Sequence, residues 1–266
     1  MKPSSSYATV NGLKLYYEIR GSGPPLTLLH GGFGSTSMFL PALGEDRQVI
    51  AADLQAHGRT ADIDRPLSYE GMAGDVAALM KTLGIEKADV MGYSMGAGVA
   101  LRMAIQHPEA VRKLVVASFA CKKDGWFPKV NATMAQMSAA SAEPMKLSPI
   151  YKVYAQIAPR PDDWPVLVGK VDDLVKKDYD WSKEVAALEM PTMLVFGDAD
   201  SVRPAHIVEF FELLGGGKKD PGWDGSGMST ARLAILPGLT HYNLFSSPAL
   251  AAAVTPFLDA PMPGAK

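Results

Sequence analysis

One serine stands where the sequence predicts a sharp turn from a strand into a helix. The apolar run 88–92 predicts a buried strand and the Ala- and Met-rich run 95–106 predicts a helix, with Ser94 between them. Glycines flank it in the pattern G-x-S-x-G, so Ser94 can occupy a tight, strained turn that exposes its hydroxyl above the sheet. The following helix would direct its positive amino end at a developing oxyanion. This context favours a nucleophile, and a structural or phosphate-binding Gly/Ser turn is the alternative.

A serine hydroxyl needs a base within hydrogen-bond reach, and His241 is the best candidate among the five histidines. It lies in a loop just after the last predicted strand, and a loop at a strand's carboxyl end can reach the serine. A structural loop histidine is the alternative. Of the other histidines, we expect a structural hydrogen bond from His30, a solvated position for His206 and a surface or capping role for His107. His57 lies in a loop after a strand, and lining the site is only a minor alternative for it.

Two aspartates follow the preceding predicted strand, and we expect one of them to orient the histidine. The stretch Phe196-Gly197-Asp198-Ala199-Asp200 contains both. Asp200 is favoured because a residue beyond the turn can fold back toward His241. Asp198 is the alternative candidate, and its expected role is to accept hydrogen bonds from backbone amides of the turn.

Two backbone amides are expected to hold the negative charge that develops on a substrate oxygen. One belongs to Met95, the residue after the serine, and the other to Gly32 or Phe33 in the loop that begins at His30. Each such donor typically lowers a reaction barrier by about 3–4 kcal/mol. A simple turn is the alternative, whereas a phosphate cradle is disfavoured because the loop lacks the Lys-Ser/Thr ending of a P-loop.

These residues require a sheet whose strands end at one edge. Short apolar runs predict strands at 26–29, 49–52, 88–92, 114–117, 192–196 and 234–236, after a hairpin at 9–18. Helical spacing predicts helices at 71–83, 95–106, 205–214 and about 248–258. The alternation of strands and helices predicts an α/β fold with a mostly parallel central sheet flanked by helices.

The segment 122–187 interrupts this alternation and carries no strong strand pattern. Scattered Met, Trp and Tyr residues between prolines predict a helical cap insertion over the carboxyl ends of the strands, where open α/β sheets bind ligands. Residues 1–121 and 188–266 would then form the core. A Gly- and Lys-rich segment, 215–228, is expected to be a solvated loop.

The charge balance and the cysteine count exclude several classes of function. A formal net charge of -2 gives no reason to expect nucleic acid or a membrane surface as a partner. Cys121 is the sole cysteine, which rules out an internal disulfide and a multi-cysteine metal site. The amino-terminal residues lack the apolar region of a signal peptide, and no stretch is apolar enough to span a bilayer. We therefore expect a cytoplasmic protein, either a monomer or a homodimer.

In these motifs and their order, the chain resembles the α/β-hydrolase superfamily, in its capped, lipase/esterase-like form. The matching stretches, in the family's order, are 30–34, 53–60, 92–98, 197–204 and 238–242. One departure is visible: the loop after Asp53 usually reads Asp-x-x-Gly-x-Gly, and Ala56 replaces its first glycine. Because that loop is structural in the family, the departure puts little in doubt.

The resemblance implies acyl transfer to water by a catalytic triad of Ser94, Asp200 and His241, with no metal or organic cofactor. The expected activity is that of a carboxylesterase on a small-molecule ester. A cofactor-free haloperoxidase or perhydrolase, a carbon–carbon bond hydrolase, and a lactonase or amidase share the triad and are alternatives. A ligand-binding receptor that reuses the fold is a non-enzyme alternative. The serine argues against epoxide hydrolases and haloalkane dehalogenases, which carry a carboxylate nucleophile.

The predicted cap would select the substrate. Large side chains of the segment could line an apolar pocket or could only pack the cap onto the core. The candidates for substrate binding are Met134, Met137, Tyr154 and Trp164 from the segment, and Tyr93 beside the nucleophile.

Overall fold

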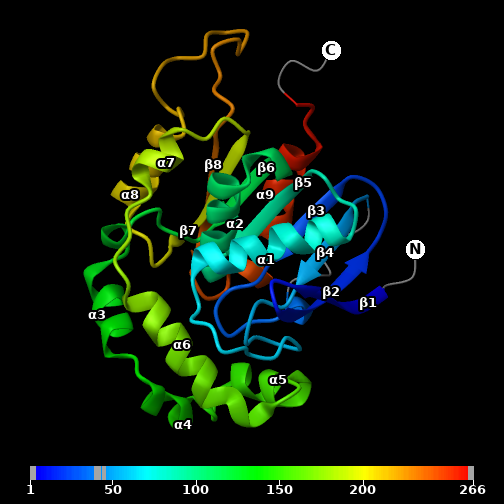
Figure 1. Ribbon diagram of the computed structural model, residues 1–266. Helices are drawn as coiled ribbons and strands as arrows, with labels where there is room; N and C mark the ends of the chain where they lie inside the picture. Colours follow the sequence, from blue (N-terminus) through cyan, green and yellow to red (C-terminus); the bar gives the residue numbers. More distant parts are fainter. Residues whose placement is uncertain (1–3, 39–42, 44–45, 263–266) are drawn as a thin grey trace.

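In the computed structural model, which describes residues 4–38, 43 and 46–262, eight strands form a single sheet (Figure 1). The strands are β1 (Ser4–Val10), β2 (Leu13–Arg20), β3 (Pro25–Leu29), β4 (Gln48–Ala52), β5 (Ala88–Tyr93), β6 (Val111–Ala117), β7 (Thr192–Ala199) and β8 (Arg232–Thr240). Their order is β1-β2-β4-β3-β5-β6-β7-β8. Strands β3 to β8 are parallel, whereas β1 and β2 pair antiparallel at one edge. The predicted α/β fold is confirmed.

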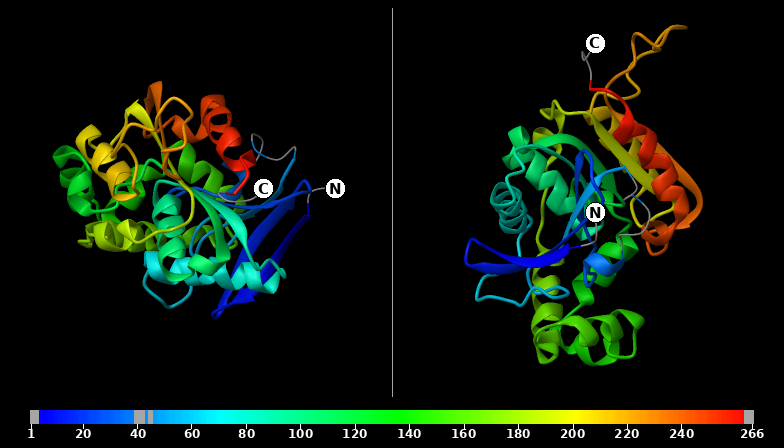
Figure 2. Two further views of the ribbon diagram at one scale, coloured as in Figure 1. Left: turned by 90° about the horizontal axis from the view of Figure 1, so that it is seen from above. Right: turned by 90° about the vertical axis from the view of Figure 1, so that its right-hand side faces the viewer.

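Helices cover both faces of the sheet (Figure 2). They are α1 (Tyr69–Thr82), α2 (Met95–Gln106), α8 (Pro204–Leu213) and α9 (Pro248–Asp259). Apolar residues of α1, α2 and α8 form one core with one set of strand side chains. The alternate strand side chains pack with α9 on the other face. In β5, for example, Val90 faces the first core and Met91 the second, because side chains alternate along a strand.

The predicted elements occur, and several extend beyond the predicted bounds. Helix α1 begins before residue 71 because the Ser68 side chain accepts a hydrogen bond from the Gly71 amide and caps the helix. Strand β7 continues to Ala199, and β8 continues past Pro237 to Thr240. β8 is an edge strand, and one of its sides has no neighbouring strand. A proline, which has no amide hydrogen to donate, is tolerated in such a strand.

The segment 122–187 runs from β6 to β7 and contains five helices in its described residues. They are α3 (Pro128–Gln136), α4 (Ala142–Met145), α5 (Pro149–Ile157), α6 (Trp164–Lys176) and α7 (Ser182–Ala186). Helices α3 to α6 extend away from the sheet as one body (Figure 1). The Lys170 ammonium joins α6 to the loop after β4, where it contacts Asp62 at 2.6 Å.

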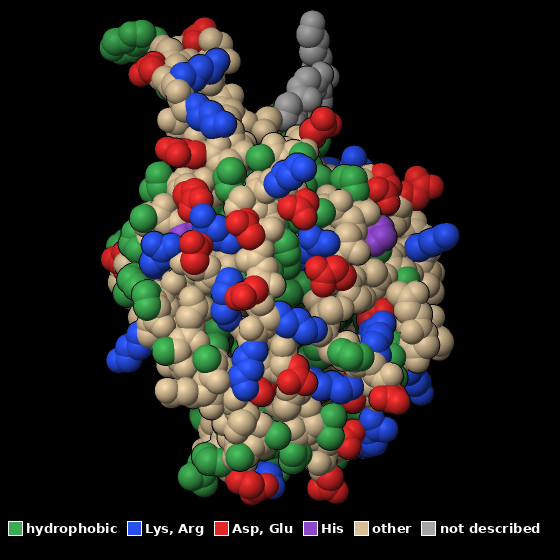
Figure 3. Space-filling model, turned by 60° about the vertical axis from the view of Figure 1, so that its left-hand side comes forward, with side chains coloured by type: hydrophobic (Ala, Val, Ile, Leu, Met, Phe, Trp, Pro, Cys, Tyr) green, Lys and Arg blue, Asp and Glu red, His purple; other side chains and the backbone are tan. Residues whose placement is uncertain are grey.

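The Gly- and Lys-rich residues 215–228 project from the rest of the molecule between α8 and β8 (Figures 1 and 2). The Trp223 side chain in this projection is fully exposed. Figure 3 shows charged side chains of both signs on the projection. In the described part of the chain, no helix is long and apolar enough to cross a membrane.

Candidate active site

Ser94 lies on the turn that joins β5 to α2. Its φ of 52° is in the left-handed region, which a residue with a side chain occupies only under strain. A Cβ at Gly92 would collide with the backbone of Gly96, and one at Gly96 would collide with the carbonyl of Leu29. The two glycines therefore allow the close approach that the turn requires. The Ser94 side chain is partly exposed above the sheet.

The structure brings the predicted serine, histidine and aspartate together. The Ser94 Oγ lies 3.0 Å from the His241 Nε2, and the His241 Nδ1 lies 3.2 Å from the Asp200 Oδ1. Because an ionised carboxylate only accepts hydrogen bonds, the Nδ1 carries the imidazole proton and the Nε2 is free to accept from the serine hydroxyl. Residues 200 and 241 directly follow β7 and β8, so neighbouring parallel strands deliver both to one edge of the sheet.

The Asp200 carboxyl is buried and surrounded by hydrogen-bond donors. Burial by itself raises its pKa, but hydrogen bonds from His241, Ser118 and the Gly197 amide offset this and hold the pKa below its ordinary value. The group is therefore ionised at neutral pH. Asp198, by contrast, is exposed and accepts a hydrogen bond from the Gly238 amide at 2.9 Å. It lies outside the serine–histidine–aspartate chain.

The loop after β3 faces the amino end of α2. Strands β3 and β5 are neighbours, although the chain visits β4 between them, so this is the point where the strand order reverses. A Cβ added at Gly32 would lie 4.0 Å from the Met95 side chain. Phe33 has a φ of 61°, another left-handed residue with a side chain. In the described structure, neither the Phe33 amide nor the Met95 amide donates to a backbone or side-chain acceptor.

Two buried residues hold this loop and the loop after β4 together. The Asp53 carboxylate accepts hydrogen bonds from the amides of Thr36 (2.6 Å) and Arg59 (2.7 Å). The His30 Nε2 accepts one from the Leu54 amide, so the expected structural role of His30 is confirmed. Ala56, which replaces a glycine of the family pattern, has a φ of 66°. The departure therefore falls at a position whose backbone conformation favours glycine.

A cavity of about 620 Å³ opens beside His241. Its lining is mostly apolar and comes from the start of the 122–187 segment, with Trp126, Phe127, Val130, Met134 and Met137. Asp200, Ser201 and Tyr242 complete the wall on the core side. Met134 and Met137 thus lie where the sequence predicted a substrate pocket.

The other three candidates for substrate binding do not line this cavity. Trp164 is fully buried, donates from its indole to the Ala142 carbonyl and packs against Phe33 with ring centroids 5.5 Å apart. Tyr154 packs against Trp164 inside the segment. Tyr93 donates its hydroxyl to the His241 backbone carbonyl. Large aromatic side chains satisfy internal packing as readily as ligand contact, so substrate binding by these three residues stays a prediction.

Two residues of the site were not predicted from the sequence, and the surroundings of His206 were predicted wrongly. The Trp126 ring lies edge-on to His241, with centroids 5.7 Å apart, and Ser118 donates to Asp200. A polar residue directly after β6 was the available signal for Ser118. His206 was expected to be solvated, but it is buried and its Nε2 accepts from the Cys121 amide at 3.2 Å. His57 is fully buried against His30.

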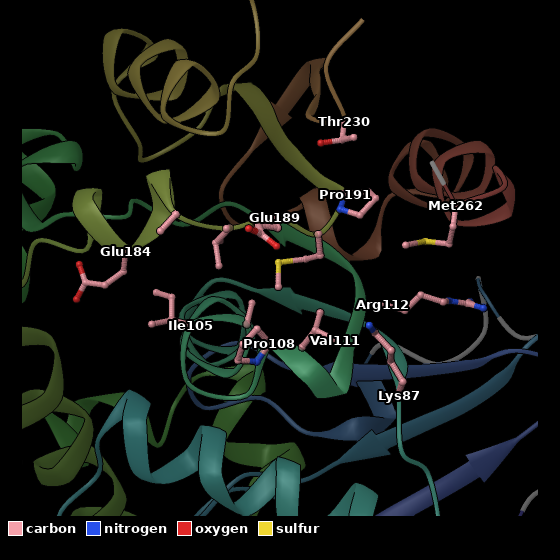
Figure 4. Close-up of a pocket in the computed structure, with 14 residues that line it drawn as sticks. Lys87, Ile105, Pro108, Val111, Arg112, Glu184, Glu189, Pro191, Thr230 and Met262 are labelled. Atoms are coloured by element: carbon pink, nitrogen blue, oxygen red, sulfur yellow. The ribbon is translucent and has the colours of Figure 1, made fainter. Parts of the chain in front are cut away.

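A second cavity, of about 600 Å³, lies at the opposite edge of the sheet (Figure 4). Its walls include Lys87 and Pro191, which precede β5 and β7, and Val111, which begins β6. None of its described lining residues is a serine, cysteine or histidine, so it offers no serine–histidine or cysteine–histidine pair. Nor do any three His, Cys, Asp or Glu side chains of the described residues gather as a metal site.

Comparisons with known proteins agree with this geometry. A family model described as the alpha/beta hydrolase fold matches residues 24–145, which include the turn that carries Ser94 and the loop after β3. Solved structures with the same fold superpose over nearly the whole chain. An enol-lactonase from Burkholderia xenovorans covers 96% of this chain and 100% of its own, with a TM-score of 0.70 at 24% identity.

The family model and this superposition show that the chain has the α/β-hydrolase fold. A second structure with this fold, the carboxylesterase CesB from Bacillus subtilis, covers 98% of this chain and 93% of its own, with a TM-score of 0.73 at 20% identity. Among curated relatives, RutD from Azorhizobium caulinodans is named provisionally as a carbamate hydrolase. It is 26% identical over 221 residues, which are 76% of this chain and 83% of that protein. These α/β-hydrolases share an architecture but differ in their named substrates.

Proposed function

We propose that the protein is a serine hydrolase that cleaves small to medium carboxylic esters through an acyl-Ser94 intermediate. The observation that carries the proposal is the continuous hydrogen-bond chain from the Ser94 Oγ through both nitrogens of His241 to Asp200. A buried carboxylate, an oriented imidazole and a strained serine are together the requirements for activating a hydroxyl at neutral pH.

In the proposed reaction, His241 takes the proton of Ser94 as the oxygen attacks the ester carbonyl. The amides of Met95 and Phe33 receive the oxyanion, and Gly32 is the alternative donor. In the described structure none of these three amides donates to a backbone acceptor, so each is free to receive a substrate oxygen. His241 then protonates the leaving alcohol, and in a second round it activates the water that releases the acid.

The cavity indicates which substrates fit this chemistry. Its apolar wall from Trp126 to Met137 favours a neutral hydrocarbon or aromatic group beside His241, and the volume suits a small-molecule ester. We propose that the 122–187 segment acts as the cap that supplies this wall, with Trp126 placing the first aromatic side chain against the imidazole.

Hydrolysis of p-nitrophenyl esters of increasing acyl length tests the proposal. Wild-type protein is expected to turn over short and medium chains, and Ser94→Ala is expected to lower kcat by at least about 10⁴-fold with an unchanged circular dichroism spectrum. Thr27→Val, which removes a buried hydroxyl from β3, is the matched control and should retain full activity. Turnover by Ser94→Ala at the wild-type rate would refute the nucleophile.

The name of one structural relative supports lactone hydrolysis as an alternative reaction. A lactone is a cyclic ester, and the Burkholderia xenovorans protein is named an enol-lactonase, so lactones belong in the same substrate series. A receptor that reuses the fold would instead bind such molecules without turnover. A fluorophosphonate probe separates the two, because an activated Ser94 reacts covalently and an unactivated serine does not.

A further inference from the structure

Ser118 occupies a strained position directly beside the proposed triad. It is the first residue after β6, its side chain is fully buried, and its φ is 55°. Its hydroxyl donates to the Asp200 Oδ2 at 2.5 Å. A residue with a side chain is costly in this backbone conformation, and glycine would adopt it freely. The backbone conformation therefore does not account for a side chain at this position, whereas the hydrogen bond of the hydroxyl does.

Strand β6 lies between the strand that carries the nucleophile and the strand that carries the acid. The Ala117 carbonyl accepts a hydrogen bond from the Ser94 amide at 2.9 Å. The next residue, Ser118, donates its amide to the Val195 carbonyl of β7 at 2.9 Å. Backbone hydrogen bonds of Ala117 and Ser118 thus connect the turn that carries Ser94 to β7. The Ser118 side chain adds a hydrogen bond to the Asp200 carboxylate.

The hydrogen bonds around Asp200 divide between its two oxygens. The Oδ1 faces His241 and also accepts from the Val202 amide at 3.3 Å. The Oδ2 accepts from Ser118 and, at 3.3 Å, from the Gly197 amide. The contact from Ser118 is the shortest of the four. Because the two oxygens share one plane, a donor that fixes the Oδ2 also fixes the direction of the Oδ1 toward the imidazole.

We propose that Ser118 is a positioning residue that aligns the Asp200 carboxylate with His241, an inference that rests on the proposed function. It is fully buried, so it acts through Asp200 and not on the substrate. The titratable groups that face the carboxylate are His241 and Tyr93, and the Tyr93 hydroxyl is already engaged by the His241 carbonyl. Ser118 is therefore the side-chain hydroxyl that is available to orient the acid.

Two substitutions separate the hydroxyl from the backbone. Ser118→Ala removes the hydroxyl and keeps the strain, whereas Ser118→Gly removes the hydroxyl and relieves the strain. Thr27→Val removes a fully buried hydroxyl of β3 that has no hydrogen-bond partner among the described residues, and serves as the control. For each variant, kcat and KM for p-nitrophenyl butyrate are measured from pH 5 to 9, together with the rate of fluorophosphonate labelling and the melting temperature.

Both Ser118 variants should lose about 10- to 100-fold in kcat, because a hydrogen bond to a charged group is removed, while KM stays within about 2-fold. Without the donor, the carboxylate presents more negative charge to the imidazole, so the acid limb of the pH profile should move to higher pH by on the order of half a unit. The two variants should match in kcat although Ser118→Gly melts at a higher temperature. Thr27→Val should match the wild type.

A kcat that follows the melting temperature, or that stays at the wild-type value, would overturn the role of Ser118. These outcomes leave wild-type turnover intact and so differ from a failure of the proposed function. If the wild type is labelled at Ser94 but does not hydrolyse the ester, the role of Ser118 is judged from the labelling rates of the variants. If the wild type neither turns over nor labels, both proposals are overturned.

Discussion

The two edges of the parallel sheet use left-handed backbone in different ways. At the amino edge, the left-handed residues before β3 and β5 are the glycines Gly21, Gly23 and Gly84, which adopt this conformation without strain. At the carboxyl edge, each of the loops after β3, β4, β5 and β6 contains a residue with a side chain in this conformation, and the loop after β4 also contains Gly58. The residues with side chains are Phe33, Ala56, Ser94 and Ser118. Each such residue costs roughly 1 kcal/mol or more, so the strain is concentrated where we place the chemistry.

The difference shows which side chains the site requires. Ser94 and Ser118 contribute hydroxyls to the hydrogen-bond chain, and Phe33 contributes a ring that packs against Trp164 of the inserted segment. Glycine would remove the strain at all three positions but would also remove these contacts. Ala56 packs a methyl group in the core but contributes neither a hydroxyl nor a ring, so among these four residues its side chain has no part in the proposed chemistry.

The largest expected effect concerns the two aspartates near the carboxyl end of β7. Asp200→Asn should lower kcat by about 10³- to 10⁴-fold, because an amide can no longer stabilise the imidazolium or hold the correct tautomer. Asp198→Asn keeps an oxygen that can accept from the Gly238 amide and should retain activity within about 2-fold. Steady-state kinetics on the same ester measure both. If the two substitutions had equal effects, the choice of Asp200 as the acid would be wrong.

A smaller effect concerns the buried histidines beneath the strained loops. Burial, and to a lesser extent the neighbouring His30, lower the pKa of His57 to about 3. Below about pH 6.5 the unfolded chain binds a proton at His57, whereas the folded chain does so only near pH 3. The free energy of unfolding is therefore undiminished above pH 6.5 and falls progressively from there toward pH 3. At pH 5 the loss amounts to about 2 kcal/mol.

Urea unfolding at pH 7 and pH 5 measures this loss. His57→Asn keeps a donor for the Gln55 carbonyl but cannot take up the proton, so its free energy of unfolding should depend less on pH than that of the wild type. His107→Asn, at a partly exposed histidine, should follow the wild-type curve. Parallel curves for all three proteins would show that His57 does not exclude a proton in the folded state.

The smallest expected effect compares the two edges directly. Gly84→Ala places a methyl group in open space at a φ of 71° and should lower the free energy of unfolding by about 1 kcal/mol through backbone strain alone. The usual cost of an Ala→Gly change, about 1 kcal/mol, should be cancelled or reversed in Ala56→Gly because the strain is relieved. Thermal or urea unfolding measures both, and a loss of about 1 kcal/mol or more in Ala56→Gly would contradict this account.

The sequence predicted the sheet and the positions of the proposed triad from local patterns. Helix 95–106 begins and ends as predicted, since Ser94 and the residues His107-Pro108 mark its ends. Residues 94, 200 and 241 could be found because each follows a recognisable strand. Their convergence then follows from parallel pairing, which brings strand ends to one edge.

What the sequence could not predict depends on contacts between distant segments. The Ser118 hydroxyl meets a carboxylate 82 positions away, and His206 is buried by the chain that leaves β6. Trp164 and Met134 both read as candidate pocket residues, yet one is enclosed within the inserted segment and the other lines the cavity. Composition alone does not separate packing from lining, because both favour large apolar side chains.

Mass spectrometry of protein treated with a fluorophosphonate probe tests the central claim most directly. The account predicts one adduct per chain, located at residue 94 by peptide mapping, with labelling lost in His241→Ala and Asp198→Asn labelled at the wild-type rate. An adduct at another serine, or labelling of residue 94 that persists unchanged in His241→Ala, would contradict the proposed activation of Ser94 by His241.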